Sequence, residues 1–124
     1  MEINIIAAVA KNRAIGYNND MVYFIKEDLR RFKQLTTGHT VIMGRRTFHS
    51  LPKGALPNRR NIVLSRTENN FPGCDVYTSL SEALKYIADN EKAFIIGGAS
   101  LYKEGLAVAD RLYLTEIEGI PPHA

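Results

Sequence analysis

Short apolar runs alternate along the chain with polar or amphipathic stretches. The runs are rich in Ile, Val, Leu and Ala and lack the regular polar alternation of a half-exposed strand. Nearly continuous runs of this kind are typical of strands that are covered on both faces of a sheet. We therefore predict strands over residues 3–10, 40–43, 61–64, 75–77, 93–96 and 111–117.

The stretches between these runs predict helices. In residues 26–36 apolar side chains recur at the spacing of one helix face, and Gly38 follows as a stop signal. We predict further helices over about 45–50, from Ser79 or Ser81 to about 89, and over about 100–106. Strands that alternate with helices predict an α/β fold, in a single domain of 124 residues, around a largely parallel sheet.

Polar and glycine-rich segments follow three of the predicted strands. They are Gly44-Arg45-Arg46-Thr47, Ser65-Arg66-Thr67 and Gly97-Gly98-Ala99-Ser100. Ligands of such sheets bind at the carboxyl ends of the strands, where glycines and helix N-termini accept phosphates. Any one of these segments alone is more often an ordinary tight turn. Three on one edge favour a nucleotide diphosphate, and the Ser65–Arg66 pair favours NADP over NAD.

Asp28 is the most informative carboxylate, and the spacing leaves two interpretations open. It lies in the first turn of a predicted helix, four residues before Phe32. It could be a helix N-terminal acid stabilised by the helix dipole, or a partly buried carboxylate that bonds a planar, amino-bearing heterocycle. Since the sequence offers no acid–base constellation beyond this aspartate, we expect a cofactor to supply the reaction chemistry.

Composition excludes several other classes of function. A net charge of +3 with scattered basic pairs argues against a nucleic-acid partner. No apolar segment reaches the roughly 18 residues that a membrane span needs, and the N-terminus does not resemble a signal peptide. One cysteine permits no intrachain disulfide, which favours a cytoplasmic location. The three histidines lack metal-ligand spacing, so no metal site is predicted.

Seven blocks, in order along the chain, resemble the dihydrofolate reductases of bacterial chromosomal type. The blocks are residues 6–10 with 13–16, 28–29 with 32–33, 41–45 with 47–48, 56–59, 61–65, 96–98 with Tyr102, and 112–115. The resemblance implies a dihydrofolate-reductase-like three-layer sandwich. It also implies NADPH-dependent reduction of 7,8-dihydrofolate to tetrahydrofolate in one-carbon metabolism, with dihydrofolate or an antifolate as the small-molecule partner.

The same resemblance assigns roles to individual residues. Asp28 matches the carboxylate that bonds the pterin, Thr115 its supporting hydroxyl, and Met21 and Tyr23 positions in the loop that closes over the nicotinamide. The walls of the substrate pocket are matched by Ile6, Ala8, Leu29, Phe32, Leu51 and Ile96, and the arginine that pairs with the folate glutamate by Arg59. The cofactor site is matched by Ala8, Ile15, Gly16, Gly44, Arg45, Arg46, Thr47, Leu64, Ser65, Arg66, Gly97, Gly98, Ala99, Ser100, Leu101 and Tyr102. In the family, a cis peptide joins the glycine pair at positions 97 and 98.

The chain departs from the family pattern at two places. Val22-Tyr23 stands where the family has Pro-Trp, whose tryptophan helps to hold a water near the carboxylate. The chain also stops before the family's last two strands, so we expect strand 111–117 to lie at a sheet edge. A full-length form is expected to be monomeric, and a truncated form to dimerise or exchange strands. Two alternatives therefore stay open: a catalytically incomplete NADPH- and folate-binding fragment, or a related pterin or pyrimidine reductase.

Overall fold

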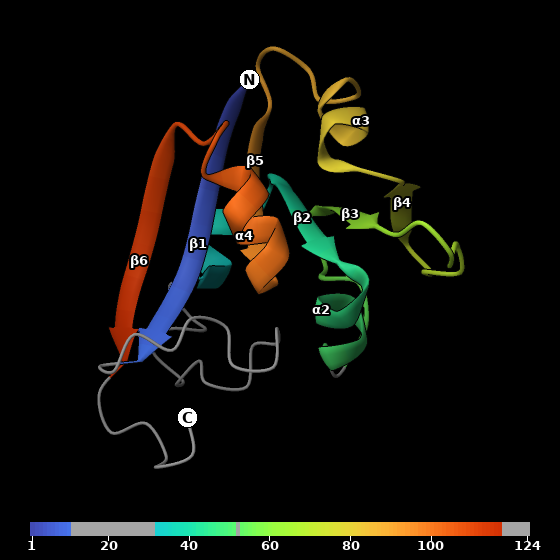
Figure 1. The fold of residues 1–124 in the computed structure, drawn as a ribbon, viewed down its shortest axis with the longest axis horizontal. Coiled ribbons are helices and arrows are strands. Elements are labelled where there is room, and N and C mark those ends of the chain that lie inside the picture. Colours follow the sequence, from blue (N-terminus) through green and yellow to red (C-terminus); the bar gives the residue numbers. More distant parts are fainter. Residues whose placement is uncertain (11–31, 52, 118–124) are drawn as a thin grey trace.

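The computed structural model describes residues 1–10, 32–51 and 53–117, and for residues 7–10 and 114–117 it describes the backbone. Residues 32–36 are helical. The remaining elements follow in the order β1 (Glu2–Ala10), β2 (Thr40–Gly44), α2 (Arg45–Ser50), β3 (Arg60–Leu64), β4 (Cys74–Tyr77), α3 (Leu80–Leu84), β5 (Lys92–Gly97), α4 (Ala99–Gly105) and β6 (Arg111–Ile117) (Figure 1). Apart from α3, these bounds agree with the predicted ones to within one residue.

The strands form one sheet in the order β4-β3-β2-β5-β1-β6, and each neighbouring pair is parallel. This confirms the predicted α/β class and the parallel sheet. Within the described part of the chain β6 pairs only with β1, so it lies at an edge, as expected. Parallel strands finish at the same end of a sheet, so the segments that follow β2, β3 and β5 are brought to one edge.

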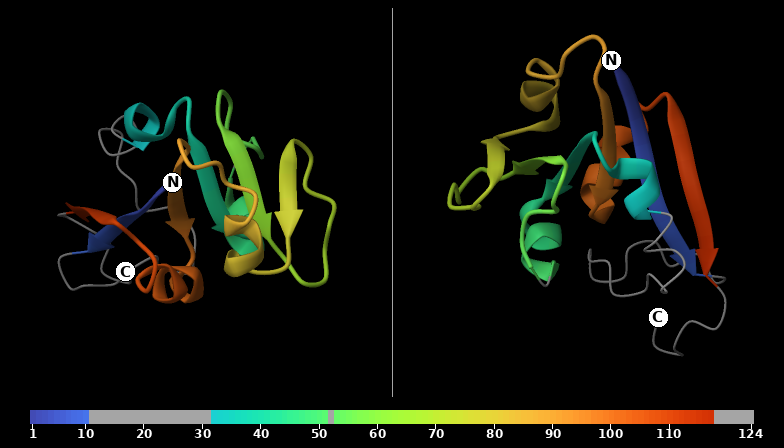
Figure 2. Two further views of the ribbon diagram at one scale, coloured as in Figure 1. Left: turned by 90° about the horizontal axis from the view of Figure 1, so that it is seen from above. Right: turned by 180° about the vertical axis from the view of Figure 1, so that it is seen from behind.

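Side chains of the central strands alternate between two apolar layers. Ile42, Ile62 and Ile95 pack with α3 and α4 on one face. Their neighbours Val41, Val63 and Phe94 pack with Phe32 and Phe48 on the other face, which is covered by the 32–36 helix and α2 (Figure 2). This period of two follows from strand geometry. Burial on both faces explains why the strands read as continuous apolar runs.

The predicted helix from residue 79 or 81 to about 89 is shorter than expected. Ser79 caps it, since its hydroxyl accepts a hydrogen bond from the backbone N–H of Glu82 at 3.2 Å. The regular helix stops at Leu84 because the next N–H groups, those of Lys85, Tyr86 and Ile87, donate to carbonyls three residues back. Ile87 is still buried in the core. The apolar periodicity thus located the buried side chains correctly while overestimating the length of the helix.

Candidate functional site

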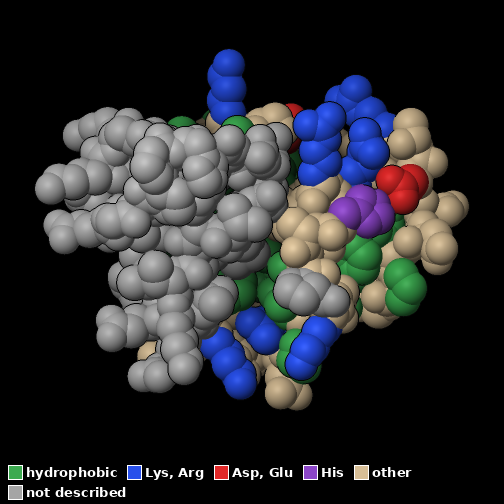
Figure 3. All heavy atoms as spheres, turned by 90° about the horizontal axis from the view of Figure 1, so that it is seen from below, with side chains coloured by type: hydrophobic (Ala, Val, Ile, Leu, Met, Phe, Trp, Pro, Cys, Tyr) green, Lys and Arg blue, Asp and Glu red, His purple; other side chains and the backbone are tan. Residues whose placement is uncertain are grey.

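The three predicted phosphate-binding segments meet at the carboxyl edge of the sheet. A hollow of about 470 Å³ is bounded by Gly44 and Arg45, by Ser65 and Arg66, and by Ser100. An adjoining hollow of about 210 Å³ shares part of this lining and adds Arg46, Thr47 and Gly98. Order along the chain predicted this meeting, and the structure confirms that the three segments enclose one continuous site. Figure 3 looks onto this end of the molecule, where Lys and Arg side chains gather beside a histidine and an acidic side chain.

Close approach of two backbones shapes the centre of this site. The register between β2 and β5 shifts after Ile42, so that Met43 pairs with Gly97. A Cβ atom placed on Gly97 would lie 2.9 Å from the Thr47 hydroxyl, and the residue has a φ of +147°. Only glycine fits such a position without a shift of its neighbours. The peptide between Gly97 and Gly98 is cis, as the family resemblance implied.

Gly44 faces the same pair of glycines but has more room. A Cβ atom there would lie 3.9 Å from the Gly97 carbonyl oxygen and from the Gly98 nitrogen. Its backbone is extended, with a φ of −78°. Where the two strands end, the backbone is therefore tightly packed at Gly97 and has room for a Cβ atom at Gly44. Gly44 lines both hollows.

The segment after β3 is organised around a buried hydroxyl. Ser65 is 7% exposed, its N–H donates to the Tyr77 carbonyl at 2.9 Å, and its Oγ accepts from the Glu68 N–H at 2.9 Å. Arg66 is exposed at the rim of the larger hollow. Glu68 forms ion pairs with Arg45 at 3.5 Å and with His49 at 3.3 Å, both at the surface. A turn fixed by Ser65 thus presents the Arg66 side chain toward the hollow's opening.

Helix α4 supplies the third side of the site. Gly98 precedes it and Ala99 and Ser100 begin it. The Tyr102 hydroxyl lies 2.7 Å from the Ile96 carbonyl and 2.9 Å from the Ile6 carbonyl, so its single hydrogen is shared between the end of β5 and the middle of β1. Burial raises the pKa of Tyr102, which keeps this phenol neutral. Leu101 is buried in the core and also reaches the hollow, as does the half-buried Leu64.

The apolar residues predicted for the substrate pocket gather on one face of the sheet. Ile6, Phe32 and Ile96 are each at most 5% exposed and belong to the same cluster, against which Leu51 packs. This cluster borders the end of β5, next to the glycine pair. The structure brings together these four members of the predicted set. For Ala8, also predicted, it gives the backbone, in register with Thr115 on β6.

Arg59 lies elsewhere, just before β3 and therefore at the amino edge of the sheet. Its Nε donates to the Pro57 carbonyl at 2.9 Å and its Nη1 to the Thr36 hydroxyl at 3.0 Å. The guanidinium carbon stands 5.9 Å from the centre of the Phe32 ring. Partial burial lowers the pKa of Arg59 but leaves it charged at neutral pH. Phe32 thus joins Arg59 to the apolar cluster.

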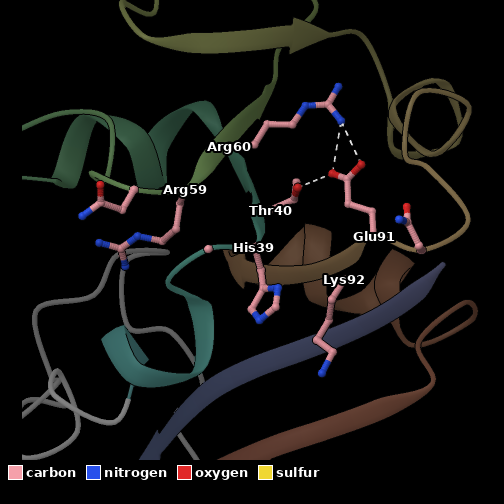
Figure 4. Close-up of a pocket in the computed structure, with 9 residues that line it drawn as sticks. His39, Thr40, Arg59, Arg60, Glu91 and Lys92 are labelled. Atoms are coloured by element: carbon pink, nitrogen blue, oxygen red, sulfur yellow. Dashed lines mark hydrogen bonds and ion pairs between the residues drawn. The ribbon is translucent and has the colours of Figure 1, made fainter.

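The next residue, Arg60, turns the other way and is fully engaged. Its guanidinium donates to Asp75 at 2.9 Å and to the Tyr86 carbonyl at 2.9 Å. It also donates to Glu91 at 3.2 Å, and Glu91 accepts a further hydrogen bond from Thr40 (Figure 4). Thr40, Arg60 and Glu91 line a hollow of about 500 Å³ where β2, β3 and β5 begin, and Arg59 lines it as well. Partial burial disfavours the charged form of Arg60, but the hydrogen bonds that it donates to the Asp75 and Glu91 carboxylates, together with their negative charge, raise its pKa.

Several predicted site residues lie outside the described residues or their side chains. Ile15, Gly16, Met21, Tyr23, Asp28 and Leu29 fall within residues 11–31, and the side chain of Thr115 is not described. Their assigned roles stay predictions.

Sequence reasoning missed three polar residues of the larger hollow, in addition to the apolar Leu80. Thr78 and Ser79 line it after β4, and Glu104 lines it from α4. A signal existed for each. Thr78 and Ser79 repeat the pattern of polar residues directly after a strand, and Glu104 is four positions after Ser100, on the same side of a helix. Within the described ranges no group of three or more His, Cys, Asp or Glu side chains could hold a metal ion, and no helix is long and apolar enough to cross a membrane.

Comparison with known proteins identifies the class of protein that this fold and site define. A family model described as dihydrofolate reductase matches residues 2–122. The chain is 46% identical over 116 residues to dihydrofolate reductase of Bacillus subtilis, covering 93% of this chain and 68% of that protein. It is 49% identical over 119 residues to dihydrofolate reductase type 3 of Salmonella typhimurium, covering 95% and 73%. The chain belongs to the dihydrofolate reductase family.

A solved structure agrees with this assignment. The dihydrofolate reductase of Enterococcus faecalis, complexed with NADP(H) and RAB-propyl, superposes with a TM-score of 0.84 at 32% identity. The match covers 94% of this chain and 71% of that chain. The resemblance read from the seven sequence blocks is thereby confirmed, as is the predicted fold.

Proposed function

We propose that the chain reduces 7,8-dihydrofolate to 5,6,7,8-tetrahydrofolate with NADPH. The observation that carries the proposal is the meeting of segments 44–47, 65–66 and 98–100 around two adjoining hollows in a chain of this family. NADPH would supply a hydride to carbon 6 of the pterin while nitrogen 5 takes a proton from the medium. The residues of the chain would bind both molecules, orient them and deliver the proton.

The shape and chemistry of the hollow fit a dinucleotide phosphate. Because Gly97 has no Cβ atom, the Thr47 hydroxyl can lie beside its backbone. The backbone of Gly44 lines both hollows. Arg45, Arg46 and Thr47 would bind the diphosphate, and Ser65 with Arg66 the 2′-phosphate, since guanidinium forks and hydroxyls complement phosphate oxygens. Leu64, Leu101 and Ser100, which line the hollow, and Tyr102 beneath it would complete the site.

The pterin would bind against the apolar cluster. Ile6, Phe32 and Ile96 are buried next to the glycine pair, and the partly buried Leu51 packs against them. Arg59, which lies over Phe32, would pair with the carboxylate of the folate glutamate. Asp28 would bond the amino group and ring nitrogen of the pterin with support from Thr115, while Met21 and Tyr23 would cover the nicotinamide. We extend the proposal to a cytoplasmic protein that is monomeric in its full-length form and that dimerises or exchanges strands in a truncated form.

The direct test is NADPH oxidation by the purified chain with dihydrofolate, with and without a diaminopyrimidine antifolate. We expect turnover that the antifolate inhibits. A chain that binds NADPH but neither turns over nor binds the antifolate would be a cofactor-binding protein. Turnover of a pterin or pyrimidine other than dihydrofolate would indicate a related reductase. Gel filtration with and without ligand would show whether the active form is a monomer.

Asp28→Asn tests the proposed catalytic carboxylate. An amide of the same shape can accept a hydrogen bond but cannot provide the charge or the proton that the carboxyl group does. We expect NADPH affinity and the unfolding transition to stay unchanged while turnover at neutral pH falls by about 100-fold or more, the usual scale for loss of an acid–base group. Turnover equal to that of the unmodified chain would remove Asp28 from the mechanism.

A further inference from the structure

We propose that Thr36 is a positioning residue that aims the Arg59 guanidinium at the carboxylate of the substrate's tail. The inference rests on the proposed function, because it concerns how the chain selects a pterin that carries a glutamate. Thr36 is completely buried, at 0% exposure. It lies at the end of the 32–36 helix, one turn after Phe32.

The Thr36 hydroxyl is fully oriented by two hydrogen bonds. Its hydrogen is donated to the Phe32 carbonyl at 2.8 Å, so its oxygen lone pairs face the other way. There the oxygen accepts a hydrogen bond from Nη1 of Arg59 at 3.0 Å. Because the hydroxyl has only one hydrogen, its bond to Phe32 leaves it to act toward Arg59 solely as an acceptor.

The backbone around Arg59 is attached to the same helix end. The Asn58 carbonyl accepts from the Gly38 N–H at 2.8 Å, and the Arg60 N–H donates to the His39 carbonyl at 3.0 Å. These bonds hold the residues before and after Arg59. The side chain is held separately by Thr36 and by the Pro57 carbonyl. The guanidinium is therefore fixed relative to the Phe32 ring, which lines the proposed pterin pocket.

The fixed guanidinium keeps its charge available for a ligand. Its two hydrogen bonds use Nε and one hydrogen of Nη1, both toward neutral oxygens, so the Nη2 end of the fork stays available within the described structure. No carboxylate among the described residues forms an ion pair with Arg59, whereas Arg60 pairs with Asp75 and also with Glu91, the latter drawn in Figure 4. An incoming carboxylate would thus meet a preoriented, uncompensated cation, and preorientation increases affinity by reducing the entropy lost on binding.

Thr36→Val tests this role, because valine keeps the shape and removes the hydroxyl. We expect the dissociation constant of dihydrofolate, measured by calorimetry, to rise about 3- to 10-fold, the value of one lost hydrogen bond. The dissociation constant of a dihydropterin without a glutamate, and that of NADPH, should stay within about twofold of the unmodified chain. Thr36→Ser should restore dihydrofolate affinity, since serine returns the hydroxyl.

Thr37 provides the matched control. Its hydroxyl donates to the Lys33 carbonyl at 2.6 Å, as that of Thr36 does to Phe32, but it is exposed and does not contact Arg59. Thr37→Val should therefore leave all three affinities unchanged. In an Arg59→Lys background, Thr36→Val should have no further effect, because the side chain that it aims is gone.

The outcomes separate this inference from the proposed function. If the unmodified chain oxidises NADPH with dihydrofolate, but Thr36→Val weakens the glutamate-free pterin as much as dihydrofolate, Thr36 only supports the pocket and the inference is wrong. Unchanged dihydrofolate affinity in Thr36→Val would overturn it as well. If the unmodified chain neither turns over nor binds dihydrofolate, the proposed function itself fails and the inference falls with it.

Discussion

The two ends of the parallel sheet each carry a pair of adjacent arginines, and their surroundings differ. At the carboxyl edge, Arg45 and Arg46 are exposed beside glycines and hydroxyls, and Arg45 has one distant partner, Glu68, at 3.5 Å. At the amino edge, Arg60 lies within hydrogen-bond distance of Asp75, Glu91 and the Tyr86 carbonyl. Its neighbour Arg59 meets only neutral oxygens among the described residues.

This comparison shows what separates a structural arginine from a ligand-binding one. The guanidinium of the structural arginine is engaged by carboxylates of the protein, whereas that of the ligand-binding arginine is not. Arg60 joins β3, β4 and the segment before β5, and two carboxylates of the described chain, Asp75 and Glu91, balance its charge. The arginines at the carboxyl edge are balanced weakly or at the surface, where ion pairs contribute little. Substitution of Arg60 should therefore change stability, whereas substitution at the carboxyl edge should change cofactor binding.

The largest effect is expected at the tight glycine of the carboxyl edge. Gly97→Ala would place a Cβ atom 2.9 Å from the Thr47 hydroxyl at a φ of +147°. We expect the free energy of unfolding to fall by about 2–3 kcal/mol and NADPH affinity to fall about 100-fold. Thermal denaturation and NADPH titration measure both.

Gly44→Ala is the control for this substitution. Its Cβ atom would have 3.9 Å of clearance in a conformation that alanine adopts readily. Stability should stay the same, while NADPH binding weakens because Gly44 lines both hollows. Equal loss of stability in the two variants would contradict the distinction between the tight and the open position.

Arg66→Gln should change the choice of cofactor. If Arg66 binds the 2′-phosphate, its removal should raise the KM for NADPH about 10- to 100-fold, the value of a charge-assisted hydrogen bond, and leave the KM for NADH unchanged. Lys85→Gln removes an equally exposed charge from α3, outside the hollow, and should alter neither value. A parallel rise in both KM values for Arg66→Gln would place the residue outside the phosphate site.

Arg60→Gln should show the opposite pattern. Removal of the guanidinium leaves Glu91 and Asp75 without their ion pairs, and we expect about 1–2 kcal/mol of lost stability, reduced by the partial exposure of these groups. NADPH affinity should be unchanged because the network lies at the far end of the sheet. A loss of NADPH affinity without a loss of stability would contradict the structural role that we assign to Arg60.

Most of the fold was predictable because the central strands are buried on both faces. Continuous apolar runs located β1, β2, β3 and β5, the mixed segments 75–77 and 111–117 were also predicted as strands, and the order of strands and helices located the binding edge. The failures have local causes. The end of α3 depends on a change to hydrogen bonds three residues apart, which leaves Leu84 and Ile87 facing inward in either case. Apolar periodicity cannot register that change.

The residues of the candidate site also fall into a group that the sequence predicts and a group that it does not. Gly44, Ser65 and Gly97 were predictable because their residue types directly follow strands. Thr36 was not, since a threonine at a helix end has many ordinary roles, and its contact with Arg59 joins positions 23 residues apart. Arg60 was equally unpredictable, because its hydrogen-bond partners lie 15 to 31 positions further along the chain and only folding brings them together.

The smallest expected effect is a pH dependence of stability that originates at the amino edge. Burial opposes ionisation of Glu91, but hydrogen bonds from Thr40, the Ala88 N–H and Arg60 outweigh it and lower the pKa of this carboxyl. A carboxyl whose pKa is lowered by folding stabilises the protein above its ordinary pKa of 4.5, and that contribution is lost as the pH falls through the folded value. The free energy of unfolding of the unmodified chain should therefore fall from about pH 5 to about pH 3, and less steeply in Glu91→Gln.

Chemical denaturation across that range measures the two slopes, with NADPH affinity at neutral pH as the control that should not change. Identical slopes would mean that Glu91 holds no more charge-dependent stability than a surface carboxylate, and the contrast between the two ends of the sheet would then rest on Arg60 and Asp75 alone.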